Sequence, residues 1–316
     1  MMGIQAFDDV ISYLQTTEDK NGNKVDMESV IASQGADFRS HYFRDEGLVN
    51  LRSIAKPVAD LALGAAIGKG LRFKETEIFL DTLVLPFISE YCQFQSEDNR
   101  RAWSQVTVKD LLRVTLGHDK GIMFSKDIKD RDPKTFVNYV VNYPITETVG
   151  EHFVYSNAGS FILSTLVTEF LGLKLVDFVD EHLFRPLSIK NFDWDSFGKY
   201  TAGCTGLWMS NRDLHKIGQL LLNQGNWEGA QIVPSHFVSE MTKPQVASPT
   251  HRYIESRAFA KWSYGLNLWI CEDGSYFCDG TDGQYLVIIP DQKLVVTALG
   301  SQPDALPVSN ALGLLK

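Results

Sequence analysis

The stretch that decides the fold is NLRSIAKP, residues 50–57, which continues into the apolar run VADLALGAAI, residues 58–67. Residues three apart on a helix lie on one face, so a helix here brings the Ser53 hydroxyl next to the Lys56 amine. A serine hydroxyl is a poor nucleophile without a base, and a desolvated lysine with a lowered pKa supplies one. Pro57 fits a first helical turn, where its missing N–H is not needed. The pattern therefore predicts a helix that begins within a residue or two of Ser53.

The spacing of Ser53 and Lys56 occurs a second time, in Ser196-Phe197-Gly198-Lys199. This second copy lies in a segment, residues 191–200, that contains two aspartates and a glycine and has no helical apolar period. It is therefore interpreted as a loop. A serine that begins a helix also serves as an ordinary N-cap, so a structural role for Ser53 stays open on this motif alone.

The composition is typical of a soluble globular protein that does not bind nucleic acid or span a membrane. The chain has 316 residues, of which 44% are hydrophobic and 22% charged. A formal charge of −9 repels nucleic acid and anionic membranes. No apolar run approaches the roughly 18 residues that cross a bilayer. The composition therefore argues against nucleic acid and membrane partners, and the oligomeric state stays open.

The N-terminus and the cysteines bear on compartment and cofactors. Residues 1–9 lack the basic start and apolar core of a secretory signal, which indicates a cytoplasmic protein as the sequence is written. The protein would be periplasmic or secreted if a signal had been trimmed away. The four cysteines, at positions 92, 204, 271 and 278, show no metal-ligand spacing. We therefore expect reduced, partly buried thiols, no metal and no cofactor.

Helical patterns dominate the middle of the chain, and strand patterns dominate its ends. The N-terminal third predicts a helix over 4–16, a hairpin over 27–43 and a polar surface loop over 90–101. Capping residues and helical apolar periods predict helices over 107–114, 158–171, 174–183 and 210–225, and a further helix that begins at residue 132. The tail predicts antiparallel strands over 264–270, 274–280, 284–289 and 294–299, then a short helix over 305–316.

Strands at both ends with helices between them predict an α/β (α+β) fold. Sequence-distant strands would close one antiparallel sheet that is flanked by helices. An α/β lobe would comprise approximately residues 1–80 and 245–316, and a mainly helical lobe, approximately 81–244, would be inserted. No linker separates these parts, so we expect a single domain over 1–316.

A second group of polar side chains, Tyr155-Ser156-Asn157, directly precedes the helix expected over 158–171. A tyrosine near a lysine can act as a general base, and an asparagine can hold a substrate carbonyl or position the lysine. The structural alternative is that Tyr155 packs in the core and Asn157 caps the helix.

Together, these two groups resemble the serine β-lactamase and penicillin-binding-protein superfamily, whose sites combine an S-x-x-K element, a polar triplet and a third motif on a strand. Further segments resemble the family in the family's order: VTVKDLL (106–112), HLFRPLSI (182–189), GLWMSNRDL (206–214) and GQYLVIIP (283–290). The tyrosine triplet resembles class C β-lactamases, D-alanyl-D-alanine carboxypeptidases and esterases. The segment around Ser53 and the Gly-Gln-Tyr at 283–285 resemble the branch with aminohexanoate-oligomer hydrolases and carboxylesterases.

The resemblance implies a β-lactamase/transpeptidase-like fold and a site in which each of these residues has a role. Ser53 would attack, Lys56 and Tyr155 would move the proton, and Asn157 would orient the lysine or the substrate. The backbone N–H groups of Ser53 and Thr281 would form the oxyanion hole.

One motif departs from the family. The third motif is usually Lys-Thr-Gly or His-x-Gly, whereas the matching place here is Cys278-Asp279-Gly280, where Asp279 and Gly280 would contact the substrate. Asp279 would repel the carboxylate of a penicillin or a D-alanyl peptide. The sequence therefore predicts a serine hydrolase that acts through an acyl-enzyme on small esters or amides. The alternatives are a D-alanyl-D-alanine carboxypeptidase or class C-like β-lactamase, and a catalytically silent binding or scaffold protein.

Overall fold

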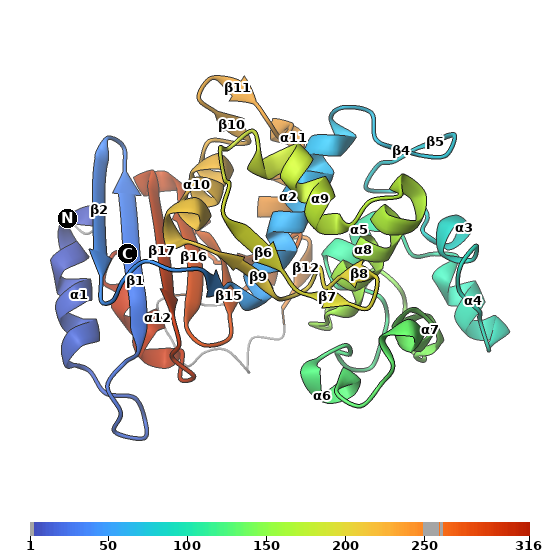
Figure 1. The fold of residues 1–316 in the computed structure, drawn as a ribbon, viewed down its shortest axis with the longest axis horizontal. Helices are drawn as coiled ribbons and strands as arrows, with labels where there is room; N and C mark the ends of the chain where they lie inside the picture. Colours follow the sequence, from blue (N-terminus) through green and yellow to red (C-terminus); the bar gives the residue numbers. More distant parts are fainter. Residues whose placement is uncertain (1–2, 249–258, 260–261) are drawn as a thin grey trace.

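The main sheet of the computed structural model is antiparallel and has eight strands in the order β12-β13-β14-β15-β16-β17-β1-β2 (Figure 1). The structure describes residues 3–248, 259 and 262–316. The two N-terminal strands β1 and β2 form the expected hairpin, and β1 pairs with β17 near the C-terminus. The strands are β1 (Met27–Gln34), β2 (Asp37–Tyr42), β12 (Val246–Ala247), β13 (Ser263–Tyr264), β14 (Trp269–Ile270), β15 (Tyr276–Gly280), β16 (Gln284–Ile289) and β17 (Leu294–Gly300). The predicted sheet closed by sequence-distant strands is thus confirmed.

Alternating residues of the central strands pack on opposite faces of the sheet. On β17, Val295 and Leu299 pack with α10 (Asn211–Leu222) in one core. Their neighbours Val296 and Ala298 pack in a second core with α1 (Phe7–Thr16) and α12 (Leu306–Gly313). This alternation is the period of two that a strand imposes on its side chains. The sheet therefore separates two cores, and α10 covers one face although it falls within residues 81–244.

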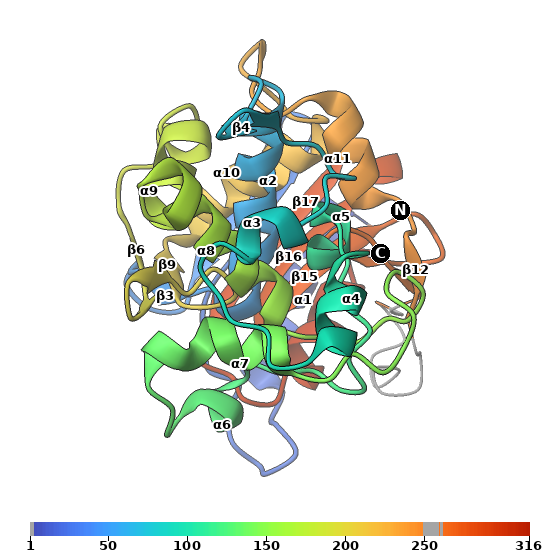
Figure 2. The same cartoon turned by 90° about the vertical axis from the view of Figure 1, so that its right-hand side faces the viewer.

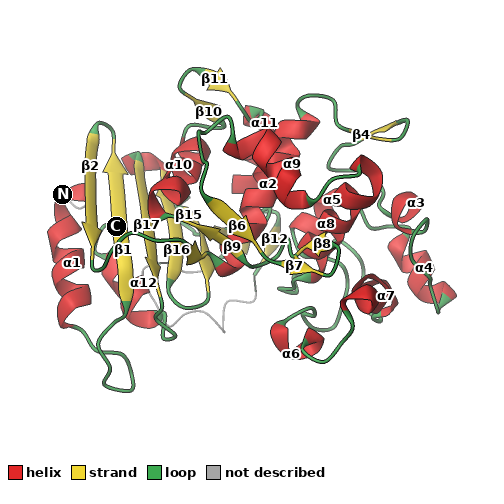
Figure 3. Ribbon diagram, in the orientation of Figure 1, coloured by secondary structure: helices red, strands yellow, loops and turns green. Residues whose placement is uncertain are grey.

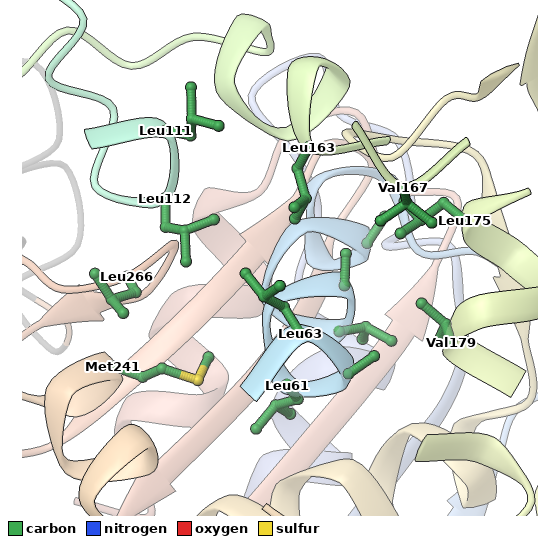
Figure 4. Packing of buried hydrophobic residues seen from close by; sticks show 14 of the residues in the cluster. Leu61, Leu63, Leu111, Leu112, Leu163, Val167, Leu175, Val179, Met241 and Leu266 are labelled. Atoms are coloured by element: carbon green, nitrogen blue, oxygen red, sulfur yellow. The ribbon is translucent and has the colours of Figure 1, made fainter. Parts of the chain in front are cut away.

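The segment that decides the fold forms the most enclosed helix, α2 (Ala55–Ile67). A 3-10 turn, Arg52–Ile54, leads into it, so the helical structure begins next to Ser53 as expected. All of its residues except Ile67 are buried. It packs against α9 (Leu175–Val179), the π-helical turn Asp180–Phe184, and α11 (Ser235–Thr242). Figure 4 shows Leu61 and Leu63 of this helix among Leu112, Leu163, Val179 and Met241.

The remaining helices form a layer on the side of α2 away from the sheet (Figures 2 and 3). They are α3 (Leu85–Ile88), α4 (Glu97–Trp103), α5 (Val108–Leu112), α6 (Ser125–Ile128), α7 (Phe136–Asn142) and α8 (Ala158–Leu171). Thr107 caps α5 with the expected capping box, Gly172 ends α8 in the left-handed conformation, and Ser210 caps α10. Within the described residues, no helix is both long and apolar enough to cross a membrane.

Short strands outside the main sheet fix the chain just before Ser53. Strand β3 (Val49–Asn50) pairs with β9 (Leu207–Met209), which also pairs with β6 (Phe192–Trp194). The Leu51 N–H donates to the Leu207 carbonyl at 2.7 Å. The chain around residues 203–207 is therefore held next to the segment that leads into α2. The other two-stranded pairs are β4 (Arg72–Phe73) with β5 (Thr76–Glu77) and β10 (Asn226–Trp227) with β11 (Ala230–Gln231).

The structure corrects several expected elements. The expected loop over 90–101 contains the start of α4, which Ser96 caps by accepting a hydrogen bond from the Asn99 N–H. The Ser196 copy of the motif is a hairpin of β7 (Ser196–Phe197) and β8 (Tyr200–Thr201), because Gly198 takes a φ of 64° at the turn.

Two further boundaries also differ. The helix expected over 107–114 ends at Leu112, because Val114 has a φ of 55° that a helix does not allow. The single strand expected over 264–270 is two strands, β13 and β14, joined by a turn in which Asn267 has a φ of 50°.

Gly64 gives a test of how tightly α2 is enclosed. A Cβ added there would lie 2.3 Å from the Phe237 ring, which is 1% exposed. We expect Gly64→Ala to destabilise the protein by about 1–3 kcal/mol, because overpacking outweighs the gain of about 1 kcal/mol in helix propensity. Thermal or urea unfolding measures this change. Gly47→Ala is the control, since nothing lies within 4 Å of that position, and equal unfolding midpoints for the two variants would contradict the prediction.

Candidate active site

Ser53 and Lys56 lie together at the start of α2. The Lys56 Nζ lies 2.9 Å from the Ser53 Oγ, 3.3 Å from the Tyr155 hydroxyl and 3.0 Å from the Cys204 carbonyl oxygen. Lys56 is only 1% exposed. The expected nucleophile, base and phenol are therefore brought into one hydrogen-bonded group, to which the structure adds Cys204.

Burial changes the proton affinity of Lys56. Desolvation lowers its pKa from 10.5 to about 8, while Cys204, Asp279, Asp60 and Cys278 act in the opposite direction. A substantial fraction of the amine is therefore unprotonated in mildly alkaline solution. A neutral amine within hydrogen-bonding distance of a hydroxyl can accept its proton.

The residue before Ser53 has a strained backbone. Arg52 has a φ of 53°, and its N–H donates to the Asn50 side chain at 2.9 Å. Its guanidinium pairs with Asp282 at 2.7 Å, and Asp282 itself has a φ of 69°. Non-glycine residues with positive φ persist where surrounding contacts hold them. The ion pair therefore ties the turn before Ser53 to the turn after β15.

Tyr155 keeps its proton in this environment. Burial, followed by the negative charge of Asp279, raises the Tyr155 pKa well above its usual value. Its ring stacks on Trp269 with centroids 5.7 Å apart and planes at 14°, and on Phe124 at 6.4 Å and 16°. Tyr155 is thus a fixed phenol that lies between two aromatic rings and touches Lys56.

The next two residues of the triplet have different surroundings. The Ser156 hydroxyl donates to the Ile122 carbonyl and accepts from the Ile122 N–H, each at 3.1 Å, so it ties a neighbouring loop to the start of α8. The Asn157 Nδ2 donates to the Met123 carbonyl at 3.0 Å, and no capping bond from its side chain to α8 is present. The buried Asn157 Oδ1 has no hydrogen-bond partner in the described part of the chain.

The third motif lies at the end of β15, against the turn that carries Ser53. A Cβ at Gly280 would lie 2.5 Å from the Leu51 carbonyl oxygen, so only glycine permits this approach. Neighbours on the strand point to opposite sides: Cys278 is buried in the core, whereas Asp279 lines the cavity above Ser53. The Asp279 Oδ1 accepts a hydrogen bond from the Trp269 Nε1 at 2.8 Å. Thr281, which follows Gly280, lines the same cavity.

The cavity has a volume of about 700 Å³ and reaches from Ser53 to the C-terminal helix α12. Ser53, Tyr155, Asn157, Asp279, Gly280 and Thr281 all line it. Its aromatic side chains are Phe124, Tyr155, Phe197, Trp269, Phe277, Tyr285 and Phe259, and its charged ones are Lys20, Arg52, Lys126, Asp279, Asp282 and Asp304. A cavity of this size suits a small molecule.

Several residues of the site carried no expectation from the sequence. Asp60 lies one turn after Lys56 and is fully buried, and burial raises its pKa well above the usual value. Its Oδ2 accepts a hydrogen bond from the Asn267 Nδ2 at 2.8 Å. The i, i+4 spacing from Lys56 was a signal that could have identified it. Cys204 and Trp269 had no such signal, because they come from segments far from Ser53 in the sequence.

No group of acidic, histidine and cysteine side chains within the described residues could hold a metal ion. The four cysteines, all in described parts of the chain, form no disulfide, and three of them are buried. The thiols are more buried than the expected partial burial, because only Cys92 is partly exposed. Phe259 also lines the cavity, and residues 249–258 and 260–261 on either side of it lie outside the described residues.

Comparison with known proteins places this chain in a family. The sequence model of the family described as Beta-lactamase matches residues 29–312. A 6-aminohexanoate-dimer hydrolase from Paenarthrobacter ureafaciens is 25% identical over 185 residues, which cover 56% of this chain and 46% of that protein. The chain spans about half the length of the curated relatives that it matches.

Solved structures show the same fold at lower identity. EstCE1, described as a hydrolase with promiscuous acyltransferase activity, matches with a TM-score of 0.71, 13% identity and coverage of 99% of this chain and 100% of that chain. A penicillin-binding protein from Bacillus halodurans matches with a TM-score of 0.68, 17% identity and coverage of 92% and 97%. The expected β-lactamase/transpeptidase-like fold is therefore confirmed.

The lowered Lys56 pKa predicts how hydrolytic activity depends on pH. Protonated Lys56 cannot accept the Ser53 proton, so kcat/KM for an ester should rise with pH through an apparent pKa near 8. The value belongs to the coupled group of Lys56 and Tyr155 rather than to one residue. A pH–rate profile measures it, and a kcat/KM that stays flat from about pH 5 to 9 would count against a Lys56 base.

Proposed function

Because the chain belongs to the beta-lactamase family, we propose that it is a serine hydrolase that cleaves small esters or amides through an acyl-enzyme. The observation that carries this proposal is the contact of 2.9 Å between the Ser53 Oγ and a buried Lys56 amine whose pKa is lowered to about 8. A serine in this environment has the base that it needs to act as a nucleophile. A binding protein would gain nothing from a buried lysine that costs free energy to desolvate.

In the proposed acylation step, the Ser53 Oγ forms a bond to the carbonyl carbon and gives its proton to the Lys56 Nζ. The oxyanion that results accepts hydrogen bonds from the backbone N–H groups of Ser53 and Thr281. The close approach of Gly280 to Leu51 supports this pairing, because it sets the end of β15 against the turn that carries Ser53.

Tyr155 completes the proton path in this proposal. Its hydroxyl gives a proton to the leaving oxygen or nitrogen and receives one from Lys56, 3.3 Å away. In deacylation a water attacks the ester carbon and its proton passes through Tyr155 to Lys56. Lys56 returns that proton to the Ser53 Oγ, 2.9 Å away, as the bond from Ser53 to the acyl carbon breaks and the free acid leaves. The raised Tyr155 pKa supports a relay in which the phenol is never a stored anion.

Asn157 is proposed to position the substrate. Its Nδ2 is already occupied by the Met123 carbonyl, and no hydrogen bond joins it to Lys56 in the described structure. Its buried Oδ1 has no partner there and can accept an N–H of an amide substrate. This supports a contact with the substrate more than an orienting role on Lys56.

Asp279 and Gly280 are proposed to define the substrate's acyl side. A carboxylate that lines the cavity repels an anionic group on the substrate, at a cost on the order of 1 to 4 kcal/mol for charges a few ångströms apart. Penicillins and peptides with a free carboxylate carry such a group. The proposal therefore favours uncharged esters and amides over β-lactams and D-alanyl peptides.

Replacing the nucleophile tests the enzyme assignment. We expect Ser53→Ala to lower kcat for a chromogenic ester by on the order of 10⁴-fold or more, because nucleophile and base act as a unit. Ser196→Ala is the matched control, since it removes the other serine of this spacing from an exposed hairpin. Wild-type turnover by the Ser53→Ala protein would show that the nucleophile is wrong.

Exchanging the charge at the third motif tests the substrate preference. The measurement is the ratio of kcat/KM for a carboxylate-bearing ester to that for its methyl ester. We expect a ratio well below one in the wild-type protein, and a rise of roughly tenfold or more in the Asp279→Asn variant, which removes the charge from the cavity wall. A wild-type ratio above one that the substitution leaves unchanged would overturn the role of Asp279.

A further inference from the structure

We propose that Asp60, a buried carboxyl one helical turn from Lys56, is a positioning residue that shares a proton with Lys56 and sets the pH at which that amine can act as a base. This inference rests on the proposed hydrolase function and concerns the control of the same site by pH. It follows from the place of Asp60 on α2, the incomplete hydrogen bonding of its carboxyl, and a buried polar network that joins it to the surroundings of Tyr155.

Asp60 and Lys56 lie on the same face of the most enclosed helix. They are four residues apart in α2, and every other residue of this helix is apolar or glycine. Asp60 is 0% exposed and Lys56 is 1% exposed. Water therefore does not screen the two groups from each other, so the charge of either one changes the proton affinity of the other.

The Asp60 carboxyl is only partly hydrogen-bonded. Its Oδ2 accepts from the Asn267 Nδ2 at 2.8 Å, whereas its Oδ1 has no partner in the described part of the chain. One neutral donor does not replace the water that an ionised carboxylate loses on burial. Burial therefore raises the pKa of Asp60 well above its usual value, against the opposite effects of Asn267 and Lys56. Asp60 thus still holds a proton at pH values at which an exposed aspartate has lost it.

A buried polar network fixes this carboxyl. Asn267 lies in the turn between β13 and β14 with a φ of 50°, and its Oδ1 accepts from the Tyr264 hydroxyl at 3.3 Å. The Tyr264 ring in turn meets the Tyr155 ring edge to face, with centroids 6.3 Å apart. The turn therefore holds the Nδ2 donor against Asp60, and the network ends at the phenol that contacts Lys56.

The ionisable groups around this pair come from several elements. Those that face Lys56, apart from Asp60, are Tyr155, Cys204, Cys278 and Asp279. Those that face Asp60 are Lys56 and Tyr264. Asp279 lines the cavity, whereas Asp60 is not among the described residues that do. Asp60 therefore acts on Lys56 from inside the protein.

Sharing a proton makes the base depend on Asp60. At low pH the pair of Lys56 and Asp60 binds two protons. Loss of one leaves the other either on Lys56, beside an ionised Asp60, or on Asp60, beside a neutral Lys56. Only the second arrangement contains an amine that can accept the Ser53 proton. The first arrangement keeps Lys56 charged, so Asp60 moves the acid limb of hydrolysis to higher pH.

Asp60→Asn tests this coupling. The variant has nearly the same shape, and its side-chain oxygen can still accept from the Asn267 Nδ2. We expect the acid limb of kcat/KM for a p-nitrophenyl ester to move about one pH unit lower, because the charge that holds the proton on Lys56 is gone. Asp110→Asn is the control, since it removes another buried carboxylate, which pairs with Arg113 at 2.7 Å and is not among the groups that influence Lys56. Its acid limb should stay at the wild-type pH.

The outcomes separate proton sharing from a structural role. A limb that Asp60→Asn leaves in place, even with a lower kcat, overturns the proposal, because a purely structural contact changes rate or stability and not the limb. If Asp60→Asn does not fold, Asn267→Gly decides. Glycine accepts the positive φ, and loss of the Nδ2 donor favours protonated Asp60, so the limb should again move to lower pH. An unchanged limb in that variant overturns the proposal.

Failure of the hydrolase function is recognised separately. If the wild-type protein does not hydrolyse the ester and a fluorophosphonate does not acylate Ser53, the function is overturned, and the role of Asp60 in it falls too. A normal wild-type profile with an unshifted limb in Asp60→Asn overturns the role of Asp60 alone.

A second readout needs no catalysis. The pKa of Asp60 is raised in the folded protein above the value of 3.8 that applies to the unfolded chain, so the wild-type protein loses stability as the pH rises above about 4. Asp60→Asn does not titrate at this position. Its free energy of unfolding, relative to that of the wild-type protein, should therefore increase from about pH 4 to 7. A difference that is constant over this range would contradict an Asp60 that shares a proton with Lys56.

Discussion

The burial of the Lys56 amine is the constraint on which the rest of the structure depends. Its pKa is lowered to about 8, whereas in the unfolded chain it would be 10.5. Between these two values the unfolded state therefore binds more protons than the folded state, so the stability of the folded protein rises as the pH rises from about 8 to 10.5. Below about pH 8, burying the charged amine costs the folded protein on the order of 3 kcal/mol. The packing of α2 between the sheet and the helical layer contributes the stabilisation that offsets this cost.

The surroundings of Lys56 come from four separate parts of the chain. The turn before α2 brings Ser53, the loop before α8 brings Tyr155, the loop before β9 brings the Cys204 carbonyl, and the end of β15 brings Asp279. Each segment is fixed by an interaction of its own. These include the Leu51–Leu207 hydrogen bond, the Arg52–Asp282 ion pair and the close contact at Gly280. These interactions also hold Arg52 and Asp282 in backbone conformations with positive φ, which are strained for residues other than glycine.

Asp279 links the electrostatics of the proton path to the cavity. Its charge raises the pKa of Lys56 and of Tyr155, and the same carboxylate is at the wall that a substrate would touch. A charge in this position therefore influences the protonation of Lys56 and, in the proposed function, the selection of a substrate. Asp60, fully buried one turn from Lys56 and bonded to Asn267, is not among the described residues that line the cavity.

The sequence determined those features that depend on local spacing. The pairing of Ser53 with Lys56 follows from the helical period, and the caps of α5, α8 and α10 follow from single residues that satisfy unpaired backbone groups. Short apolar runs between turn residues likewise predicted the strands at the C-terminal end, and strand patterns at both ends of the chain predicted a sheet closed by distant strands. The helix α4 and the hairpin at Ser196 were missed because short polar segments carry weak periodic signals.

Only the tertiary structure decided how these elements meet. That Asp279 rather than Cys278 faces the cavity depends on the register of β15 against β16, which a one-residue shift would reverse. The stack of Phe124, Tyr155 and Trp269 joins three segments that are distant in sequence, so no local pattern contains it. The low pKa of Lys56 results from the exclusion of water by the whole assembly, and desolvation is a property of the folded chain rather than of any segment.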